Sequence, residues 1–453
     1  MNNKNDLLTG TVWKKLFIFF LPIAAGTCIQ QLYNAADGLI VGRFVGTAAL
    51  AAVGGSAAQL VAFIVNTFVS LTSGAAVIVA QLFGAGKLED VKKASGNAYA
   101  ICTGLGLILG VVFIIITPWM LGLMKTPPET MADSVIYMRI YFIGLPLILL
   151  LNMESGVLRA VGDSRSPFVY MIIACLSNIV MDIVFVVVFK WAVMGVAIAT
   201  VLAQVINATL LTRKLIKIDA PWSMRRETLS LKCAHTDSML RIGIPASLQS
   251  MAYSVSNMIV QVAVNSLGTL VVASWAMSGK VDGIFWSVTS AVGAAITTFV
   301  GQNYGAGRMD RIHDCVKQGF IMAQIFTIAL SAAIMLLAYP VLGILTADAD
   351  VIETTFRIMT FLVPFYFIWT IIETFSGVLR GAGDAVVPVM ITGIGIALFR
   401  VIWVTTVFRY MGNLESLCIC YPVSWAITGI AMFVRYKRGR WQKLGRWSGH
   451  HTV

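Results

Sequence analysis

The sequence predicts an all-α integral membrane protein with twelve transmembrane helices, arranged as two pseudo-symmetric lobes of six helices each. Of the 453 residues, 58% are hydrophobic and 12% are charged, whereas a soluble domain has about 25% charged residues. Apolar runs of ~20 residues or more, long enough to cross the hydrocarbon core of a bilayer, recur along the chain. The chain also contains two pairs of similar motifs at one spacing, which indicates two similar halves.

The internal repeat is visible in two motifs. Residues 155–167 read SGVLRAVGDSRSP and residues 376–388 read SGVLRGAGDAVVP. Upstream of each, residues 81–86 read QLFGAG and residues 302–307 read QNYGAG. Both pairs are 221 positions apart (376 − 155 = 302 − 81 = 221). A membrane protein that consists of two similar halves is typically a transporter, with its pathway between the halves.

The apolar runs define the twelve spans in order. Several are longer than a bilayer requires, which a tilted or kinked helix accommodates. Pro22 and Pro245 lie early in the first and seventh spans, at matching places, and predict bends there. The predicted spans are residues 16–42, 50–83, 95–117, 135–158, 167–189, 192–214, 238–266, 271–304, 316–338, 354–379, 386–408 and 414–434.

The net charge of +12 is distributed as in a plasma-membrane protein. Nearly all Lys and Arg lie in alternate loops, which predicts an inner-membrane protein with both termini in the cytoplasm. This placement argues against nucleic-acid binding. Each half has an even number of spans, so a parallel repeat with its axis along the membrane normal is expected. The predicted segments are a cytosolic N-terminal segment (1–15), an N-lobe (16–214), a cytosolic linker (215–237), a C-lobe (238–434) and a basic cytosolic tail (435–453).

Four polar side chains in the N-half form a candidate ion site. Asp37 and Asp182 lie in the outer parts of spans one and five, Asn178 is one helical turn before Asp182, and Thr200 lies at similar depth in span six. Ionisable groups inside a membrane are costly and usually functional. Their oxygens suit a hard cation such as Na⁺, and two close carboxylates suit a proton equally well. The alternative is that Asp37 and Asp182 face water or lock helices together.

The acidic site is not duplicated in the C-half, because the position 221 residues after Asp182 is Trp403 (182 + 221 = 403). The C-half instead has Lys280 and Asp282 in span eight, Glu373 in span ten and Arg400 in span eleven. Glu373 and Arg400 could pair across helices, and a contact with substrate or ion is the alternative for these four residues. Glu154, near the end of span four, is expected to be an interfacial partner of nearby arginines.

Enzyme and ATP-driven functions have no support in the sequence. There is no Walker A lysine motif, and no clustered His, Asp or Ser motif near an interface. The seven cysteines have no metal-ligand spacing with the four histidines. We therefore expect a protein that is not an enzyme and has no cofactor.

Together these residues resemble the multidrug and toxic compound extrusion (MATE) family, over residues 14–435. The resemblance implies two six-helix lobes around a V-shaped cleft and export of cationic, amphipathic compounds in exchange for Na⁺ or H⁺. In one bacterial branch the N-lobe site uses residues that match Asp37, Asn178, Asp182 and Thr200. Another branch uses carboxylates in spans seven and ten. This chain has no carboxylate in span seven, and Glu373 is its carboxylate in span ten. The matching features are Pro22, Gln30, Asn34 and Asp37 in span one, the QLFGAG and QNYGAG motifs, the turns 159–163 and 380–384, and the Asn178–Asp182 pair.

The resulting expectation is a monomeric antiporter that works by alternating access, with Gln30, Asn34 and the four C-half residues as further candidates for substrate or polar contacts. Aromatic side chains such as Tyr33, Phe285 and Trp286 either line an apolar cleft or face lipid. The alternative function is a flippase for a lipid-linked precursor, which requires a cationic cleft for a pyrophosphate. Lys280 and Arg400 are the residues that favour this alternative.

Overall fold

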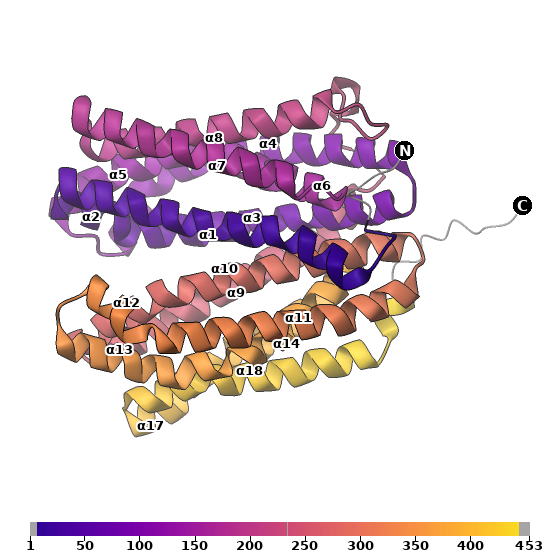
Figure 1. Ribbon diagram of the computed structural model, residues 1–453. Coiled ribbons are helices and arrows are strands. Elements are labelled where there is room, and N and C mark those ends of the chain that lie inside the picture. Colours follow the sequence, from indigo (N-terminus) through magenta and orange to yellow (C-terminus); the bar gives the residue numbers. More distant parts are fainter. Residues whose placement is uncertain (1–6, 233, 444–453) are drawn as a thin grey trace, which may run out of the picture. The chain divides into compact units, whose positions relative to one another are not determined.

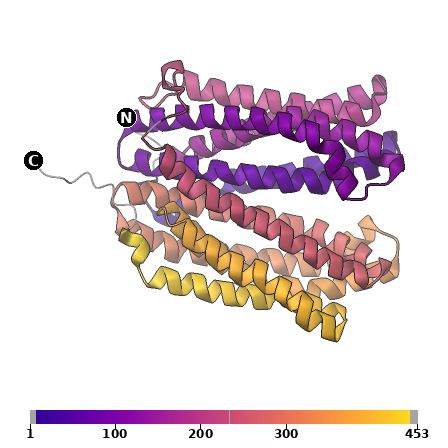
Figure 2. The ribbon, with the colours of Figure 1, turned by 180° about the vertical axis from the view of Figure 1, so that it is seen from behind.

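The computed structural model describes residues 7–232 and 234–443, and every regular element in these ranges is a helix. The described chain folds into two compact units: unit 1 comprises residues 21–247, and unit 2 comprises residues 7–20 and 248–443. Each unit is a bundle of long helices (Figure 1), and the view from behind shows the same helices from their other side (Figure 2).

Unit 1 contains the first half of the internal repeat. Its elements are α1 (Val12–Phe44) from residue 21 onward, α2 (Thr47–Gly54), α3 (Ser56–Gly84), α4 (Leu88–Leu123), α5 (Pro128–Ile143), α6 (Leu145–Ala160), α7 (Arg165–Asp182), the π-helix η1 (Ile183–Val188), α8 (Ala192–Lys217), η2 (Arg226–Thr228) and the beginning of α9 (Thr236–Ser266). α5 and α6 form one span with a bend of 46°. Pro146, in the first turn of α6, has no N–H to continue the α5 ladder.

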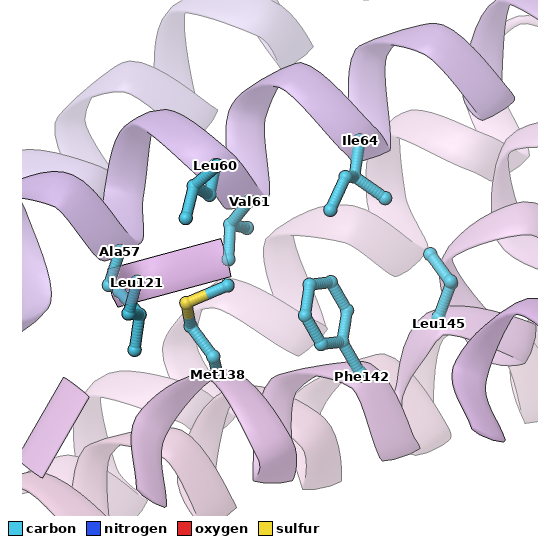
Figure 3. Close-up of a cluster of buried hydrophobic side chains, with 8 residues drawn as sticks. All are labelled: Ala57, Leu60, Val61, Ile64, Leu121, Met138, Phe142 and Leu145. Carbon is cyan, nitrogen blue, oxygen red and sulfur yellow. The ribbon is translucent and has the colours of Figure 1, made fainter. Parts of the chain in front are cut away.

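A buried apolar cluster holds α3, α4, α5 and α6 together. Leu60, Val61 and Ile64 lie on one face of α3 because three- and four-residue steps return to the same side of a helix. Figure 3 shows these side chains pointing toward Met138 and Phe142 on α5. Ala57, Leu121 and Leu145 complete the cluster. Its members are at most 8% exposed, so this packing fixes α3 against α5.

Unit 2 contains the second half of the repeat. Its elements are the rest of α9, α10 (Thr269–Gly305), α11 (Met309–Leu336), α12 (Ala338–Leu345), α13 (Ala349–Leu362), η3 (Val363–Phe365), α14 (Tyr366–Gly381), α15 (Val386–Thr392), the π-helix η4 (Gly393–Leu398), α16 (Phe399–Trp403), the π-helix η5 (Val404–Phe408), α17 (Arg409–Met411), α18 (Leu414–Lys437) and η6 (Arg440–Lys443).

Helices occupy all twelve predicted spans. In the described chain ten helices are long and apolar enough to cross a membrane, and the bent pair α5–α6 makes an eleventh. The remaining span is α9, whose 31 residues would suffice. Its polar residues, among them Gln249, Asn257 and Gln261, leave it less apolar than the others.

The repeated motifs fold into the same local structures. The amides of Gly162 and Gly383 donate to the carbonyls of residues 159 and 380, at 2.8 and 2.9 Å. Both glycines have a positive φ, 91° and 90°, a conformation in which a side chain is strained. The π-helices repeat as well, because η1 begins at Ile183 and η5 at Val404 (404 − 183 = 221). The duplication in the sequence is therefore a duplication of structure.

The last helix of each half closes on this repeated turn by an ion pair. Lys214 Nζ lies 3.9 Å from Asp163 Oδ2 in unit 1, and Arg435 Nη2 lies 2.6 Å from Asp384 Oδ2 in unit 2. The cations are 221 positions apart, as are the carboxylates (435 − 214 = 384 − 163 = 221). Arg435 Nε also donates to Asp384 Oδ2, at 3.0 Å, so the second pair is shorter and has two charge-assisted hydrogen bonds to one oxygen.

The boundary between the units lies inside α9 and not in the predicted linker 215–237. The linker packs on α4, where Asn97 donates to the carbonyl of Ser230 at 2.7 Å and accepts from the Thr236 hydroxyl at 2.9 Å. Residues 7–20 belong to unit 2, where the buried guanidinium of Arg311 donates to the carbonyls of Leu7 and Gly10. The first six residues of the predicted N-terminal segment and residues 444–453 of the predicted tail lie outside the described residues.

His235 gives the packed linker a pH dependence. Its side chain is 8% exposed, and Nε2 lies 3.9 Å from Asp90 Oδ2. Burial lowers the pKa of His235; Asp90 opposes this shift, and Lys87 and Lys93 add to it. Because the folded pKa lies below the unfolded value of ~6.5, the folded state favours the neutral ring. This stabilisation is complete above pH ~6.5 and is lost as the pH falls through the folded pKa.

We therefore expect the thermal unfolding midpoint of the purified protein to fall more between pH 7 and pH 5 than that of His235→Gln, which does not titrate there. The two proteins should be compared in the same detergent. Because every other titratable group is common to both, a difference in their pH dependence is due to His235. Identical pH dependence in the two proteins would contradict this prediction.

Candidate functional site

Unit 1 brings together the polar side chains of α1, α7 and α8. On α1, Tyr33 and Asp37 are one turn apart, and on α7 the same spacing separates Asn178 from Asp182. The carboxyl groups of Asp37 and Asp182 face each other, and the Tyr33 hydroxyl lies beside both Asp37 and the Thr200 hydroxyl. Asn178 and Asp182 are completely buried, and Thr200 is 9% exposed.

These polar atoms are not satisfied by their neighbours. Asp37 Oδ1, both amide atoms of Asn178 and both carboxyl oxygens of Asp182 have no hydrogen-bond partner among the described residues. The Thr200 hydroxyl donates to the carbonyl of Val196 at 3.0 Å, and it lies beside the Tyr33 hydroxyl. Buried polar groups without partners are rare and require an explanation. Oxygen ligands around two carboxyl groups fit a hard monovalent cation, and the facing carboxyl groups fit a shared proton.

The backbone changes its winding at this cluster. α7 ends at Asp182, and the π-helix η1 begins at the next residue, Ile183. π-turns are frequent at functional sites because the wider turn frees backbone groups and re-aims side chains. The same winding occurs in unit 2, where η4 and η5 flank the five-residue helix α16 that contains Arg400.

Two further candidates on α1 lie apart from this cluster. Gln30 and Asn34 are exposed, and the Asn34 amide contacts Gln31 Oε1 at 3.4 Å. Tyr33, which the sequence assigned to an apolar cleft or to lipid, lies beside Asp37. The four-residue spacing of Tyr33 and Asp37 on one helix could have indicated this contact.

The predicted pairing of Glu373 with Arg400 is wrong. Glu373 Oε1 accepts from Arg380 Nη2 at 3.0 Å, seven residues later on the same helix. Gly293 on α10 makes room for this carboxylate, because a Cβ there would lie 2.0 Å from Glu373 Oε1. A seven-residue step is two helical turns, which brings the two side chains to one face of α14.

The expected partnership of Glu154 with arginines is also wrong. Glu154 is completely buried in unit 1, and its Oε1 accepts a hydrogen bond from the Thr212 hydroxyl of α8. It forms no ion pair with a described arginine.

Of the four C-half candidates, the structure brings two to one cavity. Asp282 and Arg400 line a cavity of about 520 Å³ inside unit 2, whereas Lys280 is exposed and neither Lys280 nor Glu373 lines it. Trp286, which the sequence assigned either to a cleft or to lipid, lines this cavity, and Phe285 is completely buried against Tyr366.

Comparison with known proteins agrees with the duplicated architecture. The MatE family model matches residues 22–184 and again residues 245–405. The chain is 25% identical over 444 residues to the probable multidrug resistance protein YpnP of Bacillus subtilis, covering 97% of this chain and 98% of that protein. It is 22% identical over 447 residues to an FAD transporter of Shewanella oneidensis, covering 97% of each. A crystal structure of MATE in the straight conformation matches with a TM-score of 0.89 at 22% identity, covering 97% of this chain and 98% of that one.

The structural match shows the fold, and the two family matches cover both halves, so the chain belongs to the MatE family of membrane transporters.

Proposed function

We propose that the protein is a secondary active antiporter of the plasma membrane, with both termini in the cytoplasm. In this proposal it exports amphipathic, mostly cationic small molecules in exchange for Na⁺ or H⁺. Membership of the MatE family supports transport, and similarity to a protein named as a probable multidrug resistance protein supports varied cargo. The relative named as an FAD transporter supports extending the cargo to anions.

The observation that carries the coupling mechanism is the pair of carboxyl groups that face each other in unit 1. Two ionised carboxylates that face each other in a low dielectric repel each other, and a cation or a proton between them removes the repulsion. Asp37 and Asp182 would hold the ion, with Asn178 and Thr200 as further oxygen ligands. Asn178 supplies an oxygen that has no other partner among the described residues.

Occupancy of this site would change the packing of α1 against α7. With the ion bound, the two carboxyl groups attract a common partner; without it, they separate. Cargo that binds better to the separated arrangement is then exchanged for the ion, because each ligand shifts the same equilibrium by its differential affinity.

The flippase alternative loses one of its two supports. It required a cationic cleft with Lys280 and Arg400, and only Arg400 lines the unit 2 cavity.

The experiment that tests the proposal is ethidium efflux from proteoliposomes with an inward Na⁺ gradient or an inward H⁺ gradient imposed separately. We expect one gradient to drive efflux at least about tenfold faster than in liposomes without protein, a ratio that corresponds to ~1.4 kcal/mol. The gradient that drives efflux identifies the coupling ion. Efflux that neither gradient accelerates, with protein shown to be folded and inserted, would contradict antiport of cationic cargo.

A further inference from the structure

The cavity inside unit 2 has the walls of a small-molecule site. Its volume of about 520 Å³ lies within the range of pockets that bury drug-sized ligands. Residues of α9, α10, α13, α14, α16 and α18 line it, and all of them belong to unit 2. Seven of its fourteen lining residues are aromatic.

Three tryptophans form the aromatic part of the wall. The ring centroids of Trp286 and Trp369 are 4.9 Å apart, those of Trp369 and Trp425 are 6.1 Å apart, and those of Trp286 and Trp425 are 6.3 Å apart. Each pair is arranged edge to face, at 68° to 82°. Tyr253 continues the wall, 6.2 Å from Trp369. Such a set of differently oriented rings offers both faces and edges to a planar aromatic ligand.

Arg400 brings a positive charge to the same cavity, whose lining also includes the Asp282 carboxyl group. It is 4% exposed, its guanidinium lies 4.0 Å from the centre of the Tyr421 ring, and Nη1 donates to Asn257 Oδ1 at 3.3 Å. It forms no ion pair with a described carboxylate, and its Nε has no acceptor among the described residues. A guanidinium is always charged in a protein, and burying it without a counter-charge is costly.

The other unsatisfied group in the cavity wall is also a donor. Trp425 is 1% exposed, and its indole Nε1 has no acceptor among the described residues. The acidic group, in contrast, is satisfied: Asp282 accepts from the Tyr366 hydroxyl and, at 3.5 Å, from the Ser278 hydroxyl. The wall therefore includes two buried donors without acceptors, and a ligand rich in acceptors would complement the guanidinium charge beside them.

We propose that the unit 2 cavity binds a planar aromatic anion, with its ring system among Trp286, Trp369 and Trp425 and its carboxylate or phosphate group on Arg400. The polarity of this site is the opposite of that of the carboxyl pair in unit 1. The proposal depends on the proposed transport function in one respect, namely that the ligand is cargo. Binding can be measured without any gradient, so a failure of this site and a failure of antiport are distinguishable.

The test compares two dyes that share a xanthene skeleton and differ in charge: fluorescein, an anion, and rhodamine 123, a cation. Their dissociation constants are measured by fluorescence anisotropy with the purified full-length protein in phosphatidylcholine nanodiscs. We expect the wild type to bind fluorescein more tightly than rhodamine 123. Arg400→Gln should weaken fluorescein binding by about 10- to 100-fold, the range of a hydrogen bond to a charged group, without weakening rhodamine 123 binding.

Two further variants separate charge from structure. Lys280→Gln removes the same charge from an exposed residue of α10 that does not line the cavity, and should leave fluorescein binding unchanged. Arg400→Lys keeps the charge and should retain more fluorescein affinity than Arg400→Gln. Tighter binding of rhodamine 123 than of fluorescein by the wild type would overturn the proposal, whether or not the variants fold. So would equal fluorescein affinity of Arg400→Gln and wild type.

Discussion

Asp182→Asn is expected to abolish gradient-driven export while the protein stays folded. Asparagine has nearly the same shape as aspartate, but it cannot bind or release a proton and supplies one oxygen ligand fewer to a cation. Because coupling requires that the ion binds one arrangement better than the other, a site without this difference cannot drive exchange. We expect ethidium efflux in proteoliposomes to fall by about 100-fold under the gradient that drives the wild type.

Thermal stability distinguishes an ion site from a structural lock. If Asp37 and Asp182 form an ion site, Asp182→Asn removes a like-charge repulsion and should raise the unfolding midpoint in Na⁺-free buffer at a pH at which both carboxyl groups are ionised. If they lock helices together, the same change should lower it. Asp133→Asn, which neutralises an exposed carboxylate of α5, is the matched control and should transport normally. Wild-type efflux by Asp182→Asn would exclude Asp182 from coupling.

The sequence was sufficient for the architecture because the signals for it are local or periodic. Twelve apolar runs specify helices wherever they occur, since a bilayer leaves no other way to satisfy the backbone. The repeat at 221 positions even predicts details, because the turns at Gly162 and Gly383 and the windings that begin at Ile183 and Val404 have the same spacing. Asp37 and Asp182 could be associated because each is a carboxylate at similar depth in an apolar run.

The sequence was insufficient where the partner of a side chain depends on tertiary packing. Charge alone suggests that Glu373 pairs with Arg400. In the structure the missing side chain of Gly293 on α10 leaves room for the Glu373 carboxylate, which pairs with Arg380. The unit 2 cavity is composed of residues from six helices, and the spacing of Tyr421 and Trp425 on α18 indicates only that they share a face. No local pattern states which helices enclose a cavity.

The beginning of α9 belongs to unit 1, where it packs closely on α3 at two glycines. A Cβ at Gly74 of α3 would lie 2.1 Å from the carbonyl oxygen of Met239, and a Cβ at Gly243 of α9 would lie 2.4 Å from the carbonyl oxygen of Leu71. Both obstacles are backbone atoms, which cannot move aside as a flexible side chain can. Small residues permit such close approach of membrane helices.

Gly243→Ala is therefore expected to separate the beginning of α9 from α3 and to destabilise the protein by about 1–3 kcal/mol or more. The readouts are the monodisperse fraction in size-exclusion chromatography and the thermal unfolding midpoint in detergent. Gly104→Ala in α4 is the matched control: no atom lies within 4 Å of its Cβ position, and alanine is the better helix former. Hydropathy alone predicts equal effects for the two variants, since both add one methyl group to an apolar helix. Only the crossing of α3 and α9 predicts that Gly243→Ala fails while Gly104→Ala equals or exceeds the wild type. Equal stability of the two variants would therefore show that the first turns of α9 do not pack on α3.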